Sequence, residues 1–101
     1  MTITVPPEEC PSMEILRAQI DLLDTDIVSL LAKRATYIDR AVDLKQIEGL
    51  PAHIPQRVEE VLGHARSRAV QAGLDPDLVE TLWRALINWS IDREARVIRR
   101  N

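Results

Sequence analysis

Basic side chains recur along the first half of the chain at intervals that a helix would turn toward a common ligand. Arg34 and Lys45 are eleven positions apart, and at about 100° per residue a helix returns them to nearly the same face, roughly 16 Å apart along its axis. Arg17 precedes Arg34 by seventeen positions, which puts it about 25 Å away and turned by roughly 100°. Arg17 can therefore reach the same small ligand only from a second copy of the chain whose helix runs antiparallel to the first.

The chemistry that these residues offer is recognition of a small anion. A guanidinium group donates two parallel, charge-assisted hydrogen bonds to a carboxylate, and an ammonium group supplies a compact positive charge. Near the end of the chain, Ser90 and Glu94 are spaced i, i+4 and share one face of a helix. Spacing alone leaves open the alternative that all of these are solvated side chains, which is the commoner role of charged residues.

A very long helix is predicted to carry the basic residues. Residues 1–11 contain three prolines and are expected to form an extended lead-in, after which Ser12 is a suitable N-cap. From Met13 to about Gln46 there is no Pro or Gly, which predicts a helix of over thirty residues, about 50 Å long. Apolar residues recur along it with a helical period: Leu16, Ile20, Leu23, Ile27, Leu30, Leu31, Ile38 and Val42.

Two shorter helices are predicted after a break that contains glycine and proline. Pro55 suits the first position of a second helix, which is expected to run to about Ala72 and stop at Gly73. Asp75 and Pro76 are typical of the N-cap and first position of a third helix. The predicted fold is all-α: three helices, with residues 12–101 as a single helical domain.

The length of the first helix predicts a homodimer. Two short partners within a chain of 101 residues cannot cover it, and a lone domain of this size buries only about 60 to 65% of its unfolded surface. Part of the apolar stripe is therefore expected to pack against another molecule. A second copy of the same chain is the simplest partner.

Composition limits the remaining classes of function. The net charge of -3 and the pI near 5.3 give no overall attraction to nucleic acid or to an anionic membrane. A lone Cys10 and an N-terminus without a secretory signal favour a cytoplasmic protein. His53 and His64 have no cysteine or carboxylate pair at metal-ligand spacing, so no metal site is expected.

Several motifs resemble one family along nearly the whole chain. The stretch ILRAQIDLLDTDIVSLLAKRATYIDRAVDLK is similar to the first helix of the all-α (type II) chorismate mutases, with its L-R-x-x-I-D-x-L-D opening, its K/R-R pair and its final Lys. The later segments IPQRVEEVL, G-L-D and INWSIDRE also match in order. This resemblance implies an intertwined helical homodimer that acts on a small dicarboxylate substrate.

The resemblance also implies roles for six residues. Arg34 and the partner chain's Arg17 would grip the two substrate carboxylates, and Lys45 would donate to the ether oxygen where negative charge develops. The other three roles fall on Arg57, which would close over the substrate, Ser90, which would bind a carboxylate, and Glu94, which would be the second donor to the ether oxygen.

Two positions depart from the usual mutase pattern. Bacterial relatives usually have Gln where this chain has Glu94, and a carboxyl group must be protonated to donate, so activity is expected to rise toward acid pH. Val58 stands where many mutases carry a Glu, and an apolar residue there resembles the isochorismate-pyruvate lyases. Ser90, where that lyase type has a bulkier Tyr, favours a mutase.

Chorismate mutase, converting chorismate to prephenate, is therefore the predicted function. The alternative is an isochorismate-pyruvate lyase that forms salicylate and pyruvate, and a less favoured one is a non-catalytic or partner-activated helical module. Aminodeoxychorismate also stays open as a substrate. Both candidate reactions are pericyclic, so no cofactor, metal or nucleophile is expected.

Overall fold

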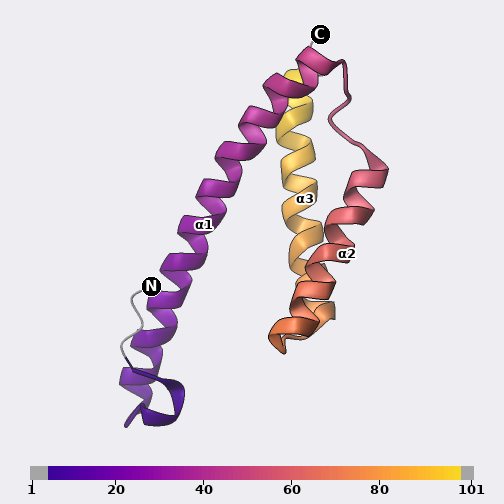
Figure 1. The fold of residues 1–101 in the computed structure, drawn as a ribbon. Coiled ribbons are helices and arrows are strands. Elements are labelled where there is room, and N and C mark those ends of the chain that lie inside the picture. The colour runs from indigo at the N-terminus through magenta and orange to yellow at the C-terminus, as the bar shows by residue number, and fades with distance from the viewer. Residues whose placement is uncertain (1–4, 99–101) are drawn as a thin grey trace. The chain divides into compact units, whose positions relative to one another are not determined.

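The computed structural model describes residues 5–98 of the chain. Figure 1 shows their elements in chain order: η1 (Pro7–Glu9), α1 (Met13–Glu48), α2 (Pro55–Ala72) and α3 (Pro76–Ile98). Among these residues every regular element is helical, so the predicted all-α fold with one very long N-terminal helix is confirmed. Residues 1–4 of the predicted lead-in and residues 99–101 of the predicted domain lie outside the described residues.

The chain divides into two compact units, and the boundary lies inside α1. The N-terminal unit ends at Tyr37, and the C-terminal unit begins at Ile38. Residues 38–48 of α1 therefore belong to the same unit as α2 and α3.

The start of α1 in the N-terminal unit follows from a side-chain cap. The backbone N–H of Ile15 donates to Ser12 Oγ at 3.3 Å, which confirms the predicted N-cap. The short helix η1 (Pro7–Glu9) lies within the segment that was predicted to be extended. The backbone N–H of Val5 donates to Gln19 Oε1 at 3.3 Å, so this segment is tied back to the first turns of α1.

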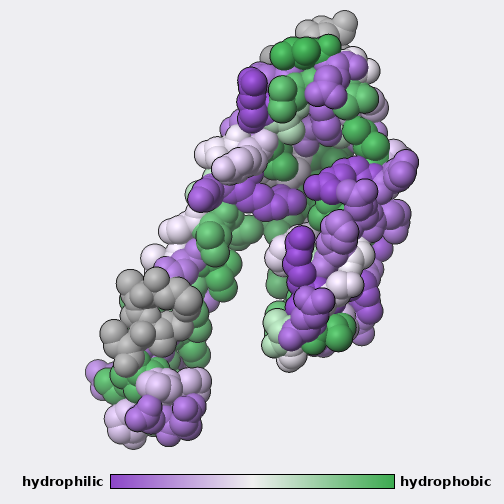
Figure 2. Space-filling model, in the orientation of Figure 1, coloured by the Kyte–Doolittle hydropathy of each residue, from purple (hydrophilic) through white to green (hydrophobic). Residues whose placement is uncertain are grey.

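Apolar side chains along α1 are largely exposed in the single chain. Ile27 is 54% exposed and Leu30 66%, and Figure 2 shows hydrophobic surface along this helix. Val42 is the one residue of α1 that is buried. An apolar surface of this extent is typical of an interaction site. The exposed set in the N-terminal unit is Met13, Ile15, Ile20, Leu23, Ile27, Val28, Leu30, Leu31 and Tyr37.

The ends of α2 and α3 lie where the sequence predicts them. Gly73 has φ 75°, a left-handed conformation that suits glycine, and the N–H of Leu74 donates to the carbonyl of Ala69 at 2.8 Å. Asp75 Oδ1 accepts the N–H of Asp77 at 2.9 Å, which caps α3. These contacts satisfy backbone groups that helix ends leave unpaired.

The core of the C-terminal unit lies between α2 and α3. Ala65 and Ala69 of α2 pack with Val79 of α3, and the half-buried Trp83 covers this cluster. Ala65 and Ala69 are one helical turn apart, so they present two small side chains on one face, which lets the helices approach closely. Farther along α3, Ile87 continues the buried stripe.

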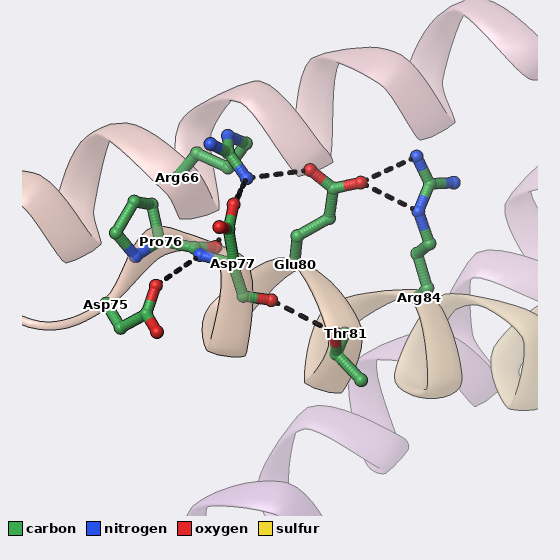
Figure 3. Close-up of polar contacts among 7 residues, drawn as sticks. All are labelled: Arg66, Asp75, Pro76, Asp77, Glu80, Thr81 and Arg84. Atoms are coloured by element: carbon green, nitrogen blue, oxygen red, sulfur yellow. Dashed lines mark hydrogen bonds and ion pairs between the residues drawn. The ribbon is translucent and has the colours of Figure 1, made fainter.

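A charged cluster joins the same two helices on the outside. Arg66 Nη1 of α2 lies 3.0 Å from Asp77 Oδ1 and 2.9 Å from Glu80 Oε1 of α3 (Figure 3). Arg84 Nη2 lies 2.9 Å from Glu80 Oε2. Arg66 is thus the side chain through which the cluster spans α2 and α3.

Replacing Arg66 tests how much this cluster stabilises the helix pair. Arg66→Ala is expected to lower the thermal midpoint by a few degrees, because exposed ion pairs contribute modestly. Arg68→Ala, on the same helix and without an ion pair among residues 5–98, is the matched control and should change the midpoint less. Equal effects of the two variants would contradict a stabilising role of the cluster.

The effect of Arg66→Ala should also depend on pH. The pKa of Glu80 is lowered by hydrogen bonds from Arg84 and then Arg66. A carboxyl group whose pKa is lower in the folded state stabilises above its unfolded pKa and loses that contribution as pH falls through the folded value. The difference between Arg66→Ala and the unmodified chain is therefore expected to shrink in acid, as measured by unfolding at a series of pH values.

Candidate active site

Lys45 and Glu94 form an ion pair within the C-terminal unit. Lys45 Nζ of α1 lies 2.7 Å from Glu94 Oε1 of α3, and it also donates to the carbonyl oxygen of Ala52 at 2.8 Å. The Glu94 side chain is 5% exposed and the Lys45 side chain 19%. The pair therefore links α1, α3 and the loop between α1 and α2. Both of its side chains are largely shielded from solvent.

The helical period of α3 explains why Glu94 is buried. Val79, Trp83 and Ile87 follow each other at intervals of four on its inner face, and Ser90 and Glu94 continue that face at intervals of three and four. Ser90 and Glu94 are each 4% exposed. The core stripe of α3 thus changes from apolar to polar at its C-terminal end, which is a signal that the sequence itself contains.

The pairing decides which groups remain available for a ligand. An ammonium group has three N–H donors, and Lys45 directs its nitrogen toward the Ala52 carbonyl and the Glu94 carboxylate. The contact with Glu94 is an ion pair, because Glu94 Oε1 has no hydrogen-bond partner among residues 5–98. The ammonium group therefore keeps donors for a further acceptor.

An open hollow of about 370 Å³ adjoins Lys45. It is bordered by the end of α1, the loop that follows and the end of α3. Its lining consists of Lys45, Gln46, Gly49, Leu50, Pro51 and Ile98.

The other predicted site residues lie at several places. Ser90 is buried one helical turn before Glu94, and its Oγ donates to the carbonyl of Leu86 at 2.8 Å. Arg57 is exposed at the start of α2 and is paired with Glu60 of its own helix. The structure thus joins Lys45 directly to Glu94, whereas Arg57 is engaged within α2.

The two remaining arginines belong to the N-terminal unit. Arg17 is exposed on α1 and Arg34 is half-buried. Their predicted roles as carboxylate ligands stay predictions.

Three contacts at the site were not predicted, and the first is the ion pair between Lys45 and Glu94. The Ala52 carbonyl is a backbone acceptor that no side-chain pattern indicates. Asp39 and Arg93 form a two-pronged ion pair, but they are 54 positions apart, and nothing in the sequence matches one to the other.

No group of three or more His, Cys, Asp or Glu side chains suited to a metal ion is found within residues 5–98. Over the same residues, none of the helices is long and apolar enough to span a membrane.

Comparison with known proteins relates this arrangement to one family. The model of the family described as chorismate mutase type II matches residues 16–95, which include Lys45 and Glu94. The chain is 35% identical over 91 residues to an isochorismate pyruvate lyase of Pseudomonas aeruginosa, covering 89% of this chain and 88% of that protein.

Other relatives are similar over most of this chain but differ in their own length. A T-protein of Enterobacter agglomerans is 35% identical over 79 residues, which are 78% of this chain but 21% of that protein. A 4-amino-4-deoxychorismate mutase of Streptomyces pristinaespiralis is 26% identical over 84 residues, 83% of this chain and 65% of that protein.

Breaking the ion pair from the lysine side should destabilise the fold. Lys45→Ala leaves a buried carboxylate without its cation, and an unsatisfied buried group costs about 1–3 kcal/mol. Adding Glu94→Gln removes the charge, so the double variant is expected to be more stable than Lys45→Ala alone. Chemical denaturation of the four proteins of this cycle measures the coupling, and additive effects would contradict a functional pairing of the two side chains.

Proposed function

Because the chain belongs to the chorismate mutase type II family, we propose that it is a chorismate mutase, which converts chorismate to prephenate by a 3,3-sigmatropic rearrangement. One observation carries the proposal: a lysine ammonium held beside a buried carboxylate, with donors available for a further acceptor. The reaction needs such a cationic donor, because negative charge develops on an ether oxygen in its transition state. It requires no nucleophile.

Lys45 would stabilise that charge. Its contacts with Glu94 and the Ala52 carbonyl hold the ammonium group in place before the substrate arrives, so little reorganisation is needed as the C–O bond breaks. A remaining donor of Lys45 would point to the ether oxygen. Enclosure of the folded enolpyruvyl side chain over the ring would supply the rest of the acceleration through orientation.

Glu94 would be the second donor to the ether oxygen when it carries a proton. A carboxyl group donates a hydrogen bond only when it is protonated. The rate of the proposed reaction is therefore expected to rise as pH falls.

The carboxylates of the substrate would be held by arginines of two chains. Arg34 of one chain and Arg17 of a second copy fit this role by their spacing on α1, and Ser90 and Arg57 would complete the contacts. The exposed apolar residues of α1 support the homodimer that this arrangement needs. A cytoplasmic location is part of the proposal, in keeping with a single cysteine that has no second one to pair with.

A second candidate is an isochorismate-pyruvate lyase, which would yield salicylate and pyruvate. Two observations favour it. The relative that matches along 88% of its own length is named as such a lyase, and the half-buried Val58 is apolar at a position where many mutases carry a glutamate. Ser90, smaller than the tyrosine of that lyase type, keeps the mutase as the first choice.

Product identification separates the candidates. The purified chain is incubated with chorismate and, separately, with isochorismate from about pH 5 to 8. Prephenate formed at a rate that rises toward acid supports the mutase, and Glu94→Gln is expected to remove this rise because an amide donates at every pH. Lys45→Ala should lower kcat by about 10²–10³.

Three results would change the assignment. Salicylate and pyruvate formed at a much higher kcat/KM would make the lyase the primary activity. Turnover of neither substrate by a dimeric sample would favour a non-catalytic or partner-activated module. Near-wild-type turnover by Lys45→Ala would contradict the role of Lys45 in either reaction.

Mixing two inactive variants tests whether each site draws on both chains. Arg17→Ala and Arg34→Ala are each expected to lose about 10²-fold or more of their activity. In a mixed dimer both changes fall on one site and the other site is intact, so an equimolar mixture after subunit exchange should regain about a quarter of wild-type activity. No recovery in a mixture that has demonstrably exchanged would place Arg17 and Arg34 of one chain in the same site.

A further inference from the structure

The side chains next to Ser90 and Glu94 on α3 form a second contact with α1. Arg93 Nε donates to Asp39 Oδ1 at 2.5 Å, and Arg93 Nη2 donates to Asp39 Oδ2 at 3.0 Å. The guanidinium carbon of Arg93 also lies 5.2 Å from the ring centroid of Trp89. Arg93 is thus held by a ring on its own helix and by a two-pronged carboxylate on α1.

This contact lies beside the ion pair of the site. Arg93 directly precedes Glu94, while their partners Asp39 and Lys45 are six positions apart on α1, about 9 Å along the helix axis. Between them, Val42 is the buried residue of α1. At about 100° per residue, Asp39 and Lys45 lie about 60° to either side of Val42, so the two ion pairs flank it.

The geometry of the Arg93 contact suits positioning more than stabilisation. The Arg93 side chain is 40% exposed and that of Asp39 50%, and exposed pairs contribute little to stability. A guanidinium fork on a carboxylate nevertheless fixes both distance and orientation, which a single point contact does not. Trp89 limits the rotamers of Arg93 further through its ring face.

Direct contact with the proposed substrate is not the role of this pair. Asp39 and Arg93 border an open hollow of about 480 Å³ whose charged lining is balanced, with two aspartates and two arginines. A substrate with two negative charges would gain little binding free energy from a lining without net charge. The pKa of Asp39 is lowered by the hydrogen bond from Arg93, so the pair stays charged over the pH range in which the site would work.

We propose that Asp39, Arg93 and Trp89 are positioning residues, which hold α3 in register with residues 38–48 of α1 so that the Glu94 carboxyl group meets the Lys45 ammonium group. The inference rests on the proposed function for its effect on catalysis. Its structural part, the coupling of one ion pair to the other, stands apart from any activity.

Kinetics of four variants test the catalytic part. Asp39→Asn and Arg93→Gln are expected to lower kcat about tenfold with KM changed less than about twofold, because a displaced donor weakens transition-state contacts more than substrate binding. Arg93→Lys keeps the charge but not the fork and should also lose activity. The double exchange Asp39→Arg with Arg93→Asp should have a kcat at least about threefold higher than the kcat of Asp39→Asn or of Arg93→Gln.

The matched controls come from the same hollow. Asp43→Asn removes a carboxylate that pairs with Arg40 within α1 at 3.5 Å, and Arg96→Ala removes a cation on α3 that borders the hollow. Both should leave kcat and KM within about twofold of wild type. Loss of activity in the controls as large as in Asp39→Asn, or a wild-type kcat in Asp39→Asn, would overturn the proposal.

An unfolding cycle tests the structural part without any substrate. The coupling between Lys45→Ala and Glu94→Gln is measured by chemical denaturation in the wild-type and in the Asp39→Asn background. The proposal expects it to fall by about half or more when Asp39 is replaced. An unchanged coupling would overturn the proposal even if the protein is an active mutase, whereas a reduced coupling in a chain that turns over neither substrate would refute only the proposed function.

Discussion

The ion pair between Lys45 and Glu94 constrains three parts of the chain at once. Removing an ammonium and a carboxylate group from water costs several kcal/mol per ion, and only close contact and further hydrogen bonds offset that loss. Lys45 comes from α1, Glu94 from α3, and the Ala52 carbonyl from the loop that links α1 to α2. Each of these segments must keep its place, since displacement of any one would leave a buried charge with fewer partners. Because burying this pair costs free energy, a role in catalysis explains its presence better than a contribution to the stability of the fold.

The first half of α1 is subject to a different constraint. Helices in proteins are stabilised mainly by packing of an apolar face, yet Ile27 and Leu30 are more than half exposed in the single chain. The capping contact at Ser12 and the contact between Val5 and Gln19 are local and do not cover that face. A second chain that covered it would also bring its own arginines close, so assembly and completion of the site would follow from the same packing.

The sequence predicted the helices well because their ends depend on local chemistry. Ser12, Gly73 and Asp75 act where their side chains or backbone freedom indicate. The resemblance to a family predicted that Lys45 and Glu94 act on the same ether oxygen, but it did not predict their ion pair, since nothing local joins positions 49 apart. The Ala52 carbonyl and the Asp39–Arg93 pair could not be predicted, because both depend on how α3 packs against the end of α1. Arg57, predicted to close over a substrate, pairs with Glu60 of its own helix.

A carboxyl group at position 94 has different consequences for the fold and for the proposed reaction. As a carboxylate it pairs with Lys45, whose ammonium group would otherwise lie beside the core without a counter-charge. A neutral amide would place no negative charge beside Lys45, but it could donate to an ether oxygen at every pH. The side chain that best pairs with Lys45 is therefore not the one that best donates to the substrate, and Glu94→Gln separates these two roles.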